Sequence, residues 1–564
     1  MKVSTMKNLQ PVSINKTIAQ LIEFVLSSNV NNANLLNEIG IIKREFEAHN
    51  MTFNSTFFKE AIIKSVEGES GIYSEIKNEV KDKCPSLMIE SASRHGNLVF
   101  LVILSYSLEE KLVKRTIGFI SQNQQQTTRH LVYQIEHLLR KVGLTLGNIY
   151  TVCTDYEGDN LKVADFINEA LAALKLCRGI ANINLDLNQM REDEREDYQM
   201  LLEEKQVDLE VMQQQHRVKV EQQNEEATIA DAVAEEGSLC TKIICGAHIF
   251  NIAVKEFIRE YEPVIAEVRD LLKTSIRDEF VQLFHDAKVK LHSWEDTFQM
   301  MSNVQRFRTQ LETIALNEER LRLSDHAWEF MDEYLQVFTP VQLAVKDFQR
   351  ADITISDFYI SWLKMELNIR SVPDGNEQLK TKLLEALKQH KQKFFESDAF
   401  VAALLLDPRI NWSQNPEDFY GPAMYERGIL LLEKVHQVIN GLQMNQEADA
   451  NQEAELRQLL GWKPLQFQGI RQSVNRFLAE PRLLPSTPIT PLKYWYNRRN
   501  EEPEIYRVSQ VVYGAAFSQV KKEKDFKGFA LVLPLLKILL GDDHLNAIIV
   551  CKNNLELLDK VKFI

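Results

Sequence analysis

Residues 97–109 read NLVFLVILSYSLE, and they lie between two further apolar runs, LMIES at residues 87–91 and LVKRTIGFIS at residues 112–121. All three runs are rich in Val, Ile, Leu and Phe and have the length of β-strands. The turn-forming sequences RHGN at residues 94–97 and EE at residues 109–110 separate them, which predicts an antiparallel order. The middle run is apolar at consecutive positions, so we expect a central strand that is covered on both faces.

Helix and strand patterns then alternate. The spacing of apolar residues predicts a helix over Thr127–Val142 and a second helix over Leu161–Leu176, with a fourth strand over Asn148–Cys153 between them. A short strand over Lys242–Cys245 runs into another helix. The order of three strands, a helix, a strand and a helix resembles the opening of the ribonuclease H-like fold, so we expect a mixed α/β protein with such a core.

Helical patterns dominate the regions on either side. TIAQLIEFVLSS and NLLNEIGIIKREFEAHN, both within residues 15–80, have the apolar spacing of helices, as do long stretches of residues 263–440. We therefore expect four regions. They are an N-terminal helical region at residues 1–86, the first part of the ribonuclease H-like core at residues 87–262, a helical insertion at residues 263–460, and the last part of the core at residues 461–564.

Composition limits the class of protein. The chain has 564 residues, of which 45% are hydrophobic and 26% charged, as in globular proteins with two to four domains. It holds no apolar run of about 18 residues, so we expect no membrane partner, and its start lacks the apolar core of a signal peptide. The six cysteines are scattered without C-x-x-C spacing, which favours reduced thiols in the cytosol or nucleus and argues against a zinc finger.

Negative charge is concentrated in one segment. Residues 191–237 hold fifteen acidic and five basic side chains, a net charge of −10, which leaves −4 of the total of −14 for the rest of the chain. Such a composition is typical of a disordered insert, which we place at residues 184–238, or of a solvated helix. An acidic arm for basic partners is a further reading. The remaining chain is close to neutral, so its charge does not mark it as a nucleic-acid binder.

Six stretches, in order along the chain, resemble motifs of the hAT superfamily of DNA transposases and of proteins domesticated from them. The six are LMIESASRHG (residues 87–96), CTDYEGDNLKV (153–163), CGAHIFNIAV (245–254), His292-Ser293-Trp294, LLLDPRINW (404–412) and LKYWYNRRNEEPEIYRVSQVVYGAAFSQVKKEKDF (492–526). Each motif is short, but together they cover roughly residues 20–560. The resemblance implies a ribonuclease H-like core and a C-terminal dimerisation region.

The resemblance also implies a catalytic site of two Asp and one Glu around two metal ions, and this chain departs from it. The first Asp position is Glu90, whose extra methylene displaces the carboxylate, and Mg²⁺ demands near-ideal geometry. The second position, Asp155, keeps its carboxylate. Ser473 falls near the expected Glu, and residues 465–479 contain no acidic residue. We therefore expect no catalytic residues, no metal and no cofactor, with Asp155 acting instead as a helix cap or turn residue.

Two further departures concern DNA and metal binding. Many members of the superfamily begin with a BED-type zinc finger, and no Cys and His pattern of that kind occurs before residue 84. Cys245 and His248 supply half of a zinc site at most, so we interpret them as core residues. Arg498-Arg499 and Lys521-Lys522-Lys524 are short basic patches for which solvated surface charge is the expected role and DNA binding the alternative.

The C-terminal region keeps part of the dimerisation pattern. Tyr494 and Trp495 match its Y-W pair, and Glu523 and Phe526 match its Glu and Phe, whereas Lys524 replaces an Arg. The resemblance implies a homodimer through these residues. The apolar runs that follow, GFALVLPLLKILLG and LNAIIVCKNNLELL, either complete the core of the chain or cover a partner, and the sequence does not choose between the two.

These observations favour a domesticated transposase-like protein that is not an enzyme. The resemblance implies a nuclear scaffold or regulator associated with chromatin or DNA, which acts on transcription through dimerisation and contacts with other nuclear proteins. The alternative is a metal-dependent transposase or nuclease in which Glu157 or Asp159 joins Glu90 and Asp155. The partner, the genomic target and the process served are not contained in the sequence.

Overall fold

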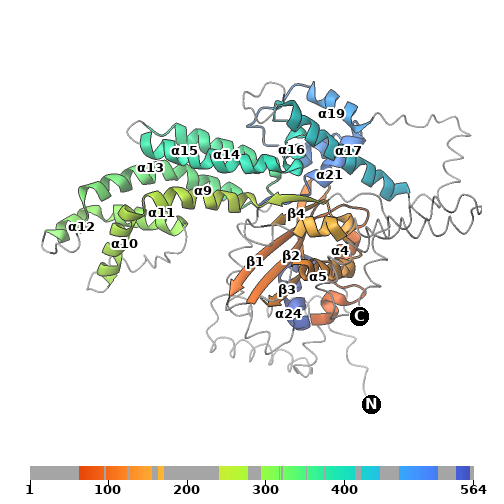
Figure 1. Ribbon diagram of the computed structural model, residues 1–564, viewed down its shortest axis with the longest axis horizontal. Helices are drawn as coiled ribbons and strands as arrows, with labels where there is room; N and C mark the ends of the chain where they lie inside the picture. Colours follow the sequence, from red (N-terminus) through yellow and green to blue (C-terminus); the bar gives the residue numbers. More distant parts are fainter. Residues whose placement is uncertain are drawn as a thin grey trace, which may run out of the picture.

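The structure of the chain is a computed structural model (Figure 1). The residues that it describes are 62–94, 97–123, 128–154, 163–170, 240–276, 294–316, 318, 322–350, 352–373, 377–412, 421–444, 469–518 and 542–558. The predicted helices before residue 62 and the acidic insert predicted at 184–238 lie outside these residues. The predicted mixed α/β class is confirmed, because one five-stranded mixed sheet is combined with many helices.

The first three strands form an antiparallel meander, as predicted. β1 (Ser86–Arg94) pairs with β2 (Asn97–Leu108), which pairs with β3 (Lys111–Asn123). Two residues connect β2 to β3, and the first of them, Glu109, has a φ of 55°. Residues 99–106 of β2 are buried on both faces, which confirms the covered central strand.

Two short strands extend the sheet on the other side of β1. β4 (Thr151–Thr154) runs parallel to β1, and β5 (Thr241–Ile244) runs parallel to β4, so the strand order is β3-β2-β1-β4-β5. β4 begins three residues later than predicted. Asn148 belongs instead to the 3₁₀ turn η2 (Leu146–Asn148), where its side chain accepts a hydrogen bond from the backbone N–H of Thr145.

Helices from both ends of the described chain cover the sheet. α5 (Thr128–Lys141) and α24 (Asp542–Asn553) pack on β3, α21 (Pro503–Val512) packs on β2, and α4 (Ile72–Val80) contacts the short helix α25 (Leu555–Leu558). Residues 163–170 are also helical, and they lie within the helix predicted over Leu161–Leu176. The burial of apolar side chains between these helices and the sheet supplies most of the stabilisation, because burying apolar surface is the dominant favourable term in folding.

The outer edge of β3 is closed by two asparagine side chains from the C-terminal helices. Asn546 accepts a hydrogen bond from the backbone N–H of Phe119 at 3.0 Å. Asn554 accepts one from the N–H of Thr116 at 3.3 Å and donates one to the carbonyl oxygen of Thr116 at 2.8 Å. The pairing of β2 with β3 shifts register between Val102 and Ile103, and these asparagines satisfy backbone groups that flank that irregularity.

A long arm of helices leaves the sheet after β5, and further helices lie at one end of the sheet (Figure 1). The arm and the helices that follow it are α9 (Gly246–Glu260), α10 (Glu262–Ile276), α11 (Trp294–Arg306), α12 (Arg308–Ala315), α13 (Asp325–Phe348), α14 (Ile355–Arg370), α15 (Glu377–Lys391), η7 (Gln392–Glu396), α16 (Asp398–Leu405), α17 (Pro422–Met444), α19 (Ile470–Leu478) and α20 (Pro491–Asn497). Within the described residues, no helix has the length and apolar character needed to cross a membrane.

An aromatic cluster joins the base of this arm to the sheet. Its members lie on α9, α13, α14, η7, α16 and the segment after α21: Phe250, Phe348, Phe358, Trp362, Phe394, Phe400 and Phe517. A side chain at Gly246 would lie 2.5 Å from the ring of Phe517, so α9 can start here only with a glycine. The backbone N–H of Gly246 also donates to the carbonyl oxygen of Phe517 at 2.8 Å.

Candidate functional site

Glu90 lies in the middle of the sheet. It follows Ile89, which pairs with Thr154 of β4, and it pairs with Leu101 of β2 on the other side. Its side chain is buried, with 8% of the residue exposed to solvent.

Asp155 lies outside the described residues, as do Glu157 and Asp159. The last described residue before Asp155 is Thr154, which is buried and accepts a hydrogen bond from the backbone N–H of Cys245 at 2.9 Å. The register of β1 and β4 therefore brings Glu90 level with the end of β4. The metal-dependent alternative and the role of Asp155 as a cap or turn residue both stay predictions.

Ser473, at the expected position of the third carboxylate, lies on α19 and is 3% exposed. α19 packs against α17 and α21. The hydroxyl oxygen of Ser473 is 3.5 Å from Oε2 of Glu504 on α21, and Oε1 of the same carboxylate is 3.8 Å from Nε2 of His436 on α17. Burial lowers the pKa of His436, and the Glu504 carboxylate, which raises it, offsets only part of this effect.

Glu504 is a carboxylate that the sequence analysis did not single out. It lies in the first turn of α21, directly after Pro503, where an acidic side chain is favourable for the helix dipole. That pattern identifies a helix start and gives no sign of the contact with α17 and α19. The fit to a two-metal site is poor in the described residues, since Glu90 and Ser473 supply one carboxylate between them.

The LLLDPRINW motif forms a buried ionic connection in the fold. Arg409 donates to Asp407 at 2.6 Å and to Asp357 of α14 at 2.8 Å, and all three side chains are at most 8% exposed. Burial alone lowers the pKa of Arg409, but its hydrogen bonds to Asp407 and Asp357 raise that pKa overall. The salt bridges of the motif thus connect the end of α16 to α14, so its role in this structure is to stabilise the fold.

The Y-W pair makes contacts within its own chain. Trp495 is fully buried, and its indole N–H donates to the carbonyl oxygen of Leu406 at 2.9 Å. Tyr494 is half-buried, and its ring packs edge-on against Trp495. Glu523 and Phe526 lie outside the described residues. Dimerisation through this region stays a prediction, and the buried indole of Trp495 offers no surface to a second subunit.

Arg498 and Arg499 make contacts within their own chain. Arg498 donates to both oxygens of Glu480, at 2.5 and 2.9 Å, and this bidentate pair is of the strong kind. The hydrogen bond from Arg498 lowers the pKa of Glu480 more than burial raises it. The guanidinium of Arg499 lies over the ring of Tyr496, 4.3 Å from its centroid, and donates to the carbonyl oxygen of Tyr496. The Lys521-Lys522-Lys524 patch lies outside the described residues.

Cys245 and His248 lie where the helix α9 begins. Cys245 is the N-cap residue of α9, and its carbonyl oxygen accepts the backbone N–H of His248 at 3.0 Å. Both residues are half-buried. Across the part of the chain that the structure describes, no three side chains of His, Cys, Asp or Glu are grouped so that they could hold a metal ion.

Comparison with known proteins adds no family assignment: no protein-family model matches the chain, and no curated protein matches it.

Proposed function

We propose that the chain is a domesticated, catalytically inactive transposase-like protein of hAT type that acts as a nuclear scaffold or regulator through protein contacts. The ordered set of sequence resemblances supports this proposal. So does the sheet, in which an antiparallel meander is followed by α5 and by two strands parallel to β1. This order agrees with the ribonuclease H-like core that the resemblance implies, with helices α9 to α17 as its insertion.

The observation that carries the inactive part of the proposal is the environment of Ser473. A serine hydroxyl is a poor substitute for the carboxylate that a divalent cation needs. Ser473 is buried among α17, α19 and α21, beside the Glu504 carboxylate. A glutamate at this position would place two carboxylates next to each other in a buried site, which is unfavourable because like charges raise each other's pKa.

Titration with Mg²⁺ and Mn²⁺ tests the proposal. A cation that binds only the folded protein raises the melting temperature with its occupancy. We expect the full chain and an Asp155→Ala variant to show the same small response up to about millimolar metal, since two carboxylates without further ligands hold Mg²⁺ weakly. A rise that disappears in both Asp155→Ala and Glu90→Gln would refute catalytic inactivity and favour the metal-dependent nuclease.

Self-association and location need separate measurements. Light scattering across micromolar concentrations should report a dimer, and a strict monomer would remove dimerisation from the proposal. A fluorescent fusion of the full chain should accumulate in the nucleus. Exclusion from the nucleus would contradict the chromatin-associated role and leave only the scaffold function open to test.

A further inference from the structure

The two edges of the sheet differ in a way that points to a binding surface. At the β3 edge, Asn546 and Asn554 bond the outward backbone groups. At the other edge, β5 is held to β4 through the N–H groups of Thr241 and Cys245, which donate to Tyr150 and Thr154 at 3.0 and 2.9 Å. Alternate residues of a parallel strand bond to the same neighbour, so the backbone groups between them face away from β4.

These outward groups belong to Lys242 and Ile244. Within the described residues, neither backbone has a hydrogen-bond partner on the side away from β4. Unpaired edge strands are templates for a further strand, and proteins usually block them with covers, charges or prolines. β5 is such an edge, although only four residues long.

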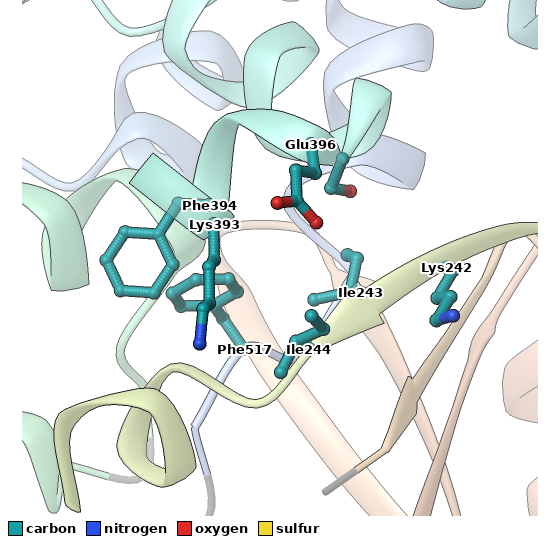
Figure 2. Close-up of a pocket in the computed structure, with 8 residues that line it drawn as sticks. Lys242, Ile243, Ile244, Lys393, Phe394, Glu396 and Phe517 are labelled. Carbon is teal, nitrogen blue, oxygen red and sulfur yellow. The ribbon is translucent and has the colours of Figure 1, made fainter. Parts of the chain in front are cut away.

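A cavity of about 290 Å³ lies beside this edge, between β5 and the turn that joins η7 to α16 (Figure 2). Ile244, Phe394 and Phe517 give it apolar walls, and Lys242 and Lys393 supply ammonium groups. Figure 2 shows Ile244 of β5 on the side of Phe517, Lys393 and Phe394, and Ile243 below Glu396. A complete small-molecule site typically occupies 300–1,000 Å³. This cavity is therefore at the lower limit for a whole ligand and is large enough for a single anchoring side chain.

The charges around the cavity favour an acidic ligand. Lys242 has no ion pair in the described part of the chain. The ammonium nitrogen of Lys393 lies 3.3 Å from Nδ1 of His390. Glu396 also lines the cavity and is exposed, so the three charged side chains at the opening sum to one positive charge.

We propose that β5 and this cavity bind an extended acidic peptide of a partner protein as an added strand. The backbone of the peptide pairs with Lys242 and Ile244, and one apolar side chain enters the cavity against Phe394 and Phe517. Separate acidic side chains lie beside Lys242 and beside Lys393. Backbone pairing supplies affinity in this mode of recognition, and the pocket for the side chain supplies specificity. The inference rests on the proposed scaffold function, because it names the kind of partner that such a scaffold binds.

Selection from a phage-displayed library of random linear peptides of about a dozen residues, carried out on the full chain, tests the proposal. Synthetic copies of the enriched peptides are then titrated by fluorescence anisotropy against three proteins. These are the wild type, a Lys242→Glu/Lys393→Glu variant, and a control variant, Lys364→Glu/Lys388→Glu, which reverses two exposed lysines on α14 and α15 away from the cavity. EDTA is present throughout, so that the result is independent of any metal site and of the fate of the inactive assignment.

We expect enriched peptides that combine acidic residues with an aliphatic or aromatic one. Their Kd should rise at least about tenfold in the Lys242→Glu/Lys393→Glu variant and less than about twofold in the control, since charge-assisted contacts are lost only in the former. Methylation of alternate backbone nitrogens of the peptide should weaken binding to a similar extent, because it removes the donors that pair with β5.

Three results would overturn the proposal. The first is the absence of enriched peptides, and the second is enrichment of peptides that bind the wild type and the Lys242→Glu/Lys393→Glu variant alike. The third is displacement of the peptide by free phenylacetate at a concentration equal to the peptide's own Kd, which would identify a small-anion site. The methylated peptides keep the test decisive if the charge-reversal variant does not fold.

Discussion

Replacing Asn554 with alanine should detach the C-terminal helices from the outer edge of the sheet. The side chain of Asn554 is fully buried at the end of α24. Its amide nitrogen donates to the carbonyl oxygens of Thr116 and Val550, both at 2.8 Å, and its oxygen accepts the backbone N–H of Thr116. Alanine cannot replace any of these bonds, so both backbone groups of Thr116 would lose their partner at an edge that no other described strand covers.

The expected cost follows from those two groups. A buried donor or acceptor that loses its partner costs about 1–3 kcal/mol. We expect a total loss of about 2–4 kcal/mol in local stability, because water entering the edge can satisfy the groups in part. The neighbouring Asn553 supplies the control. It is half-buried, and among the described residues its side chain donates only to the carbonyl oxygen of Ile549 in its own helix, so Asn553→Ala should cost less than about 1 kcal/mol.

Hydrogen exchange measured by mass spectrometry is the assay, with peptides that cover residues 111–121 of β3 as the readout. A local measurement is preferable because a chain of this size does not unfold in a single two-state step. A loss of 2–4 kcal/mol corresponds to exchange about 30 to 700 times faster in these peptides, since each 1.4 kcal/mol is a factor of ten. The reasoning is refuted if Asn554→Ala leaves exchange in β3 unchanged, or if Asn553→Ala accelerates it equally.

Three further changes test other parts of the fold. Arg409→Ala should lower the melting temperature strongly, at a cost of about 3–5 kcal/mol, because it leaves two carboxylates buried without their cation; Arg409→Lys should recover part of the loss, and a shift below 1 °C in Arg409→Ala would contradict a buried ionic role. Because the pKa of Glu480 is lowered in the folded protein, its pair with Arg498 stabilises the fold at pH values above the unfolded pKa of about 4.3, and this contribution is lost as the pH falls through the folded pKa. The difference in stability between wild type and Glu480→Gln should therefore shrink from about pH 7 to about pH 3. A difference that stays constant over this range would argue against the pair. Glu109→Gly should stabilise the hairpin by about 0.5–1 kcal/mol in thermal melts because its φ of 55° is strained for a residue with a Cβ, whereas Glu110→Gly should not stabilise it.

Part of the sheet could be predicted from the sequence and part could not. The strands of the meander were predictable because their length, their turn residues and their apolar content all indicate β-strands over neighbouring positions. The covered strand β2 was recognised from its continuous apolar run. The outer edge of β3 was not predictable. The side chain of Asn554, which lies between α24 and α25, bonds Thr116 across 438 positions of the chain, and nothing in the sequence around either residue marks this contact. The boundary of β4 was wrong because a side-chain hydrogen bond of Asn148 favours a 3₁₀ turn over an extended start.

The sequence predicted which residues belong to the candidate site, but it did not predict their hydrogen-bond and ion-pair partners. Sequence resemblance singled out Asp407, Arg409 and Trp495, and the structure places all three inside the chain, hydrogen-bonded to its own groups. Buried contacts of this kind serve packing in a catalytic chain and in an inactive one alike. A resemblance carried by them is therefore an argument about the fold, and it gives no information about catalysis. The chemical question depends on whether the carboxylates of Glu90 and Asp155 bind a metal ion. The metal titration, and not the number of matching motifs, therefore decides between scaffold and nuclease.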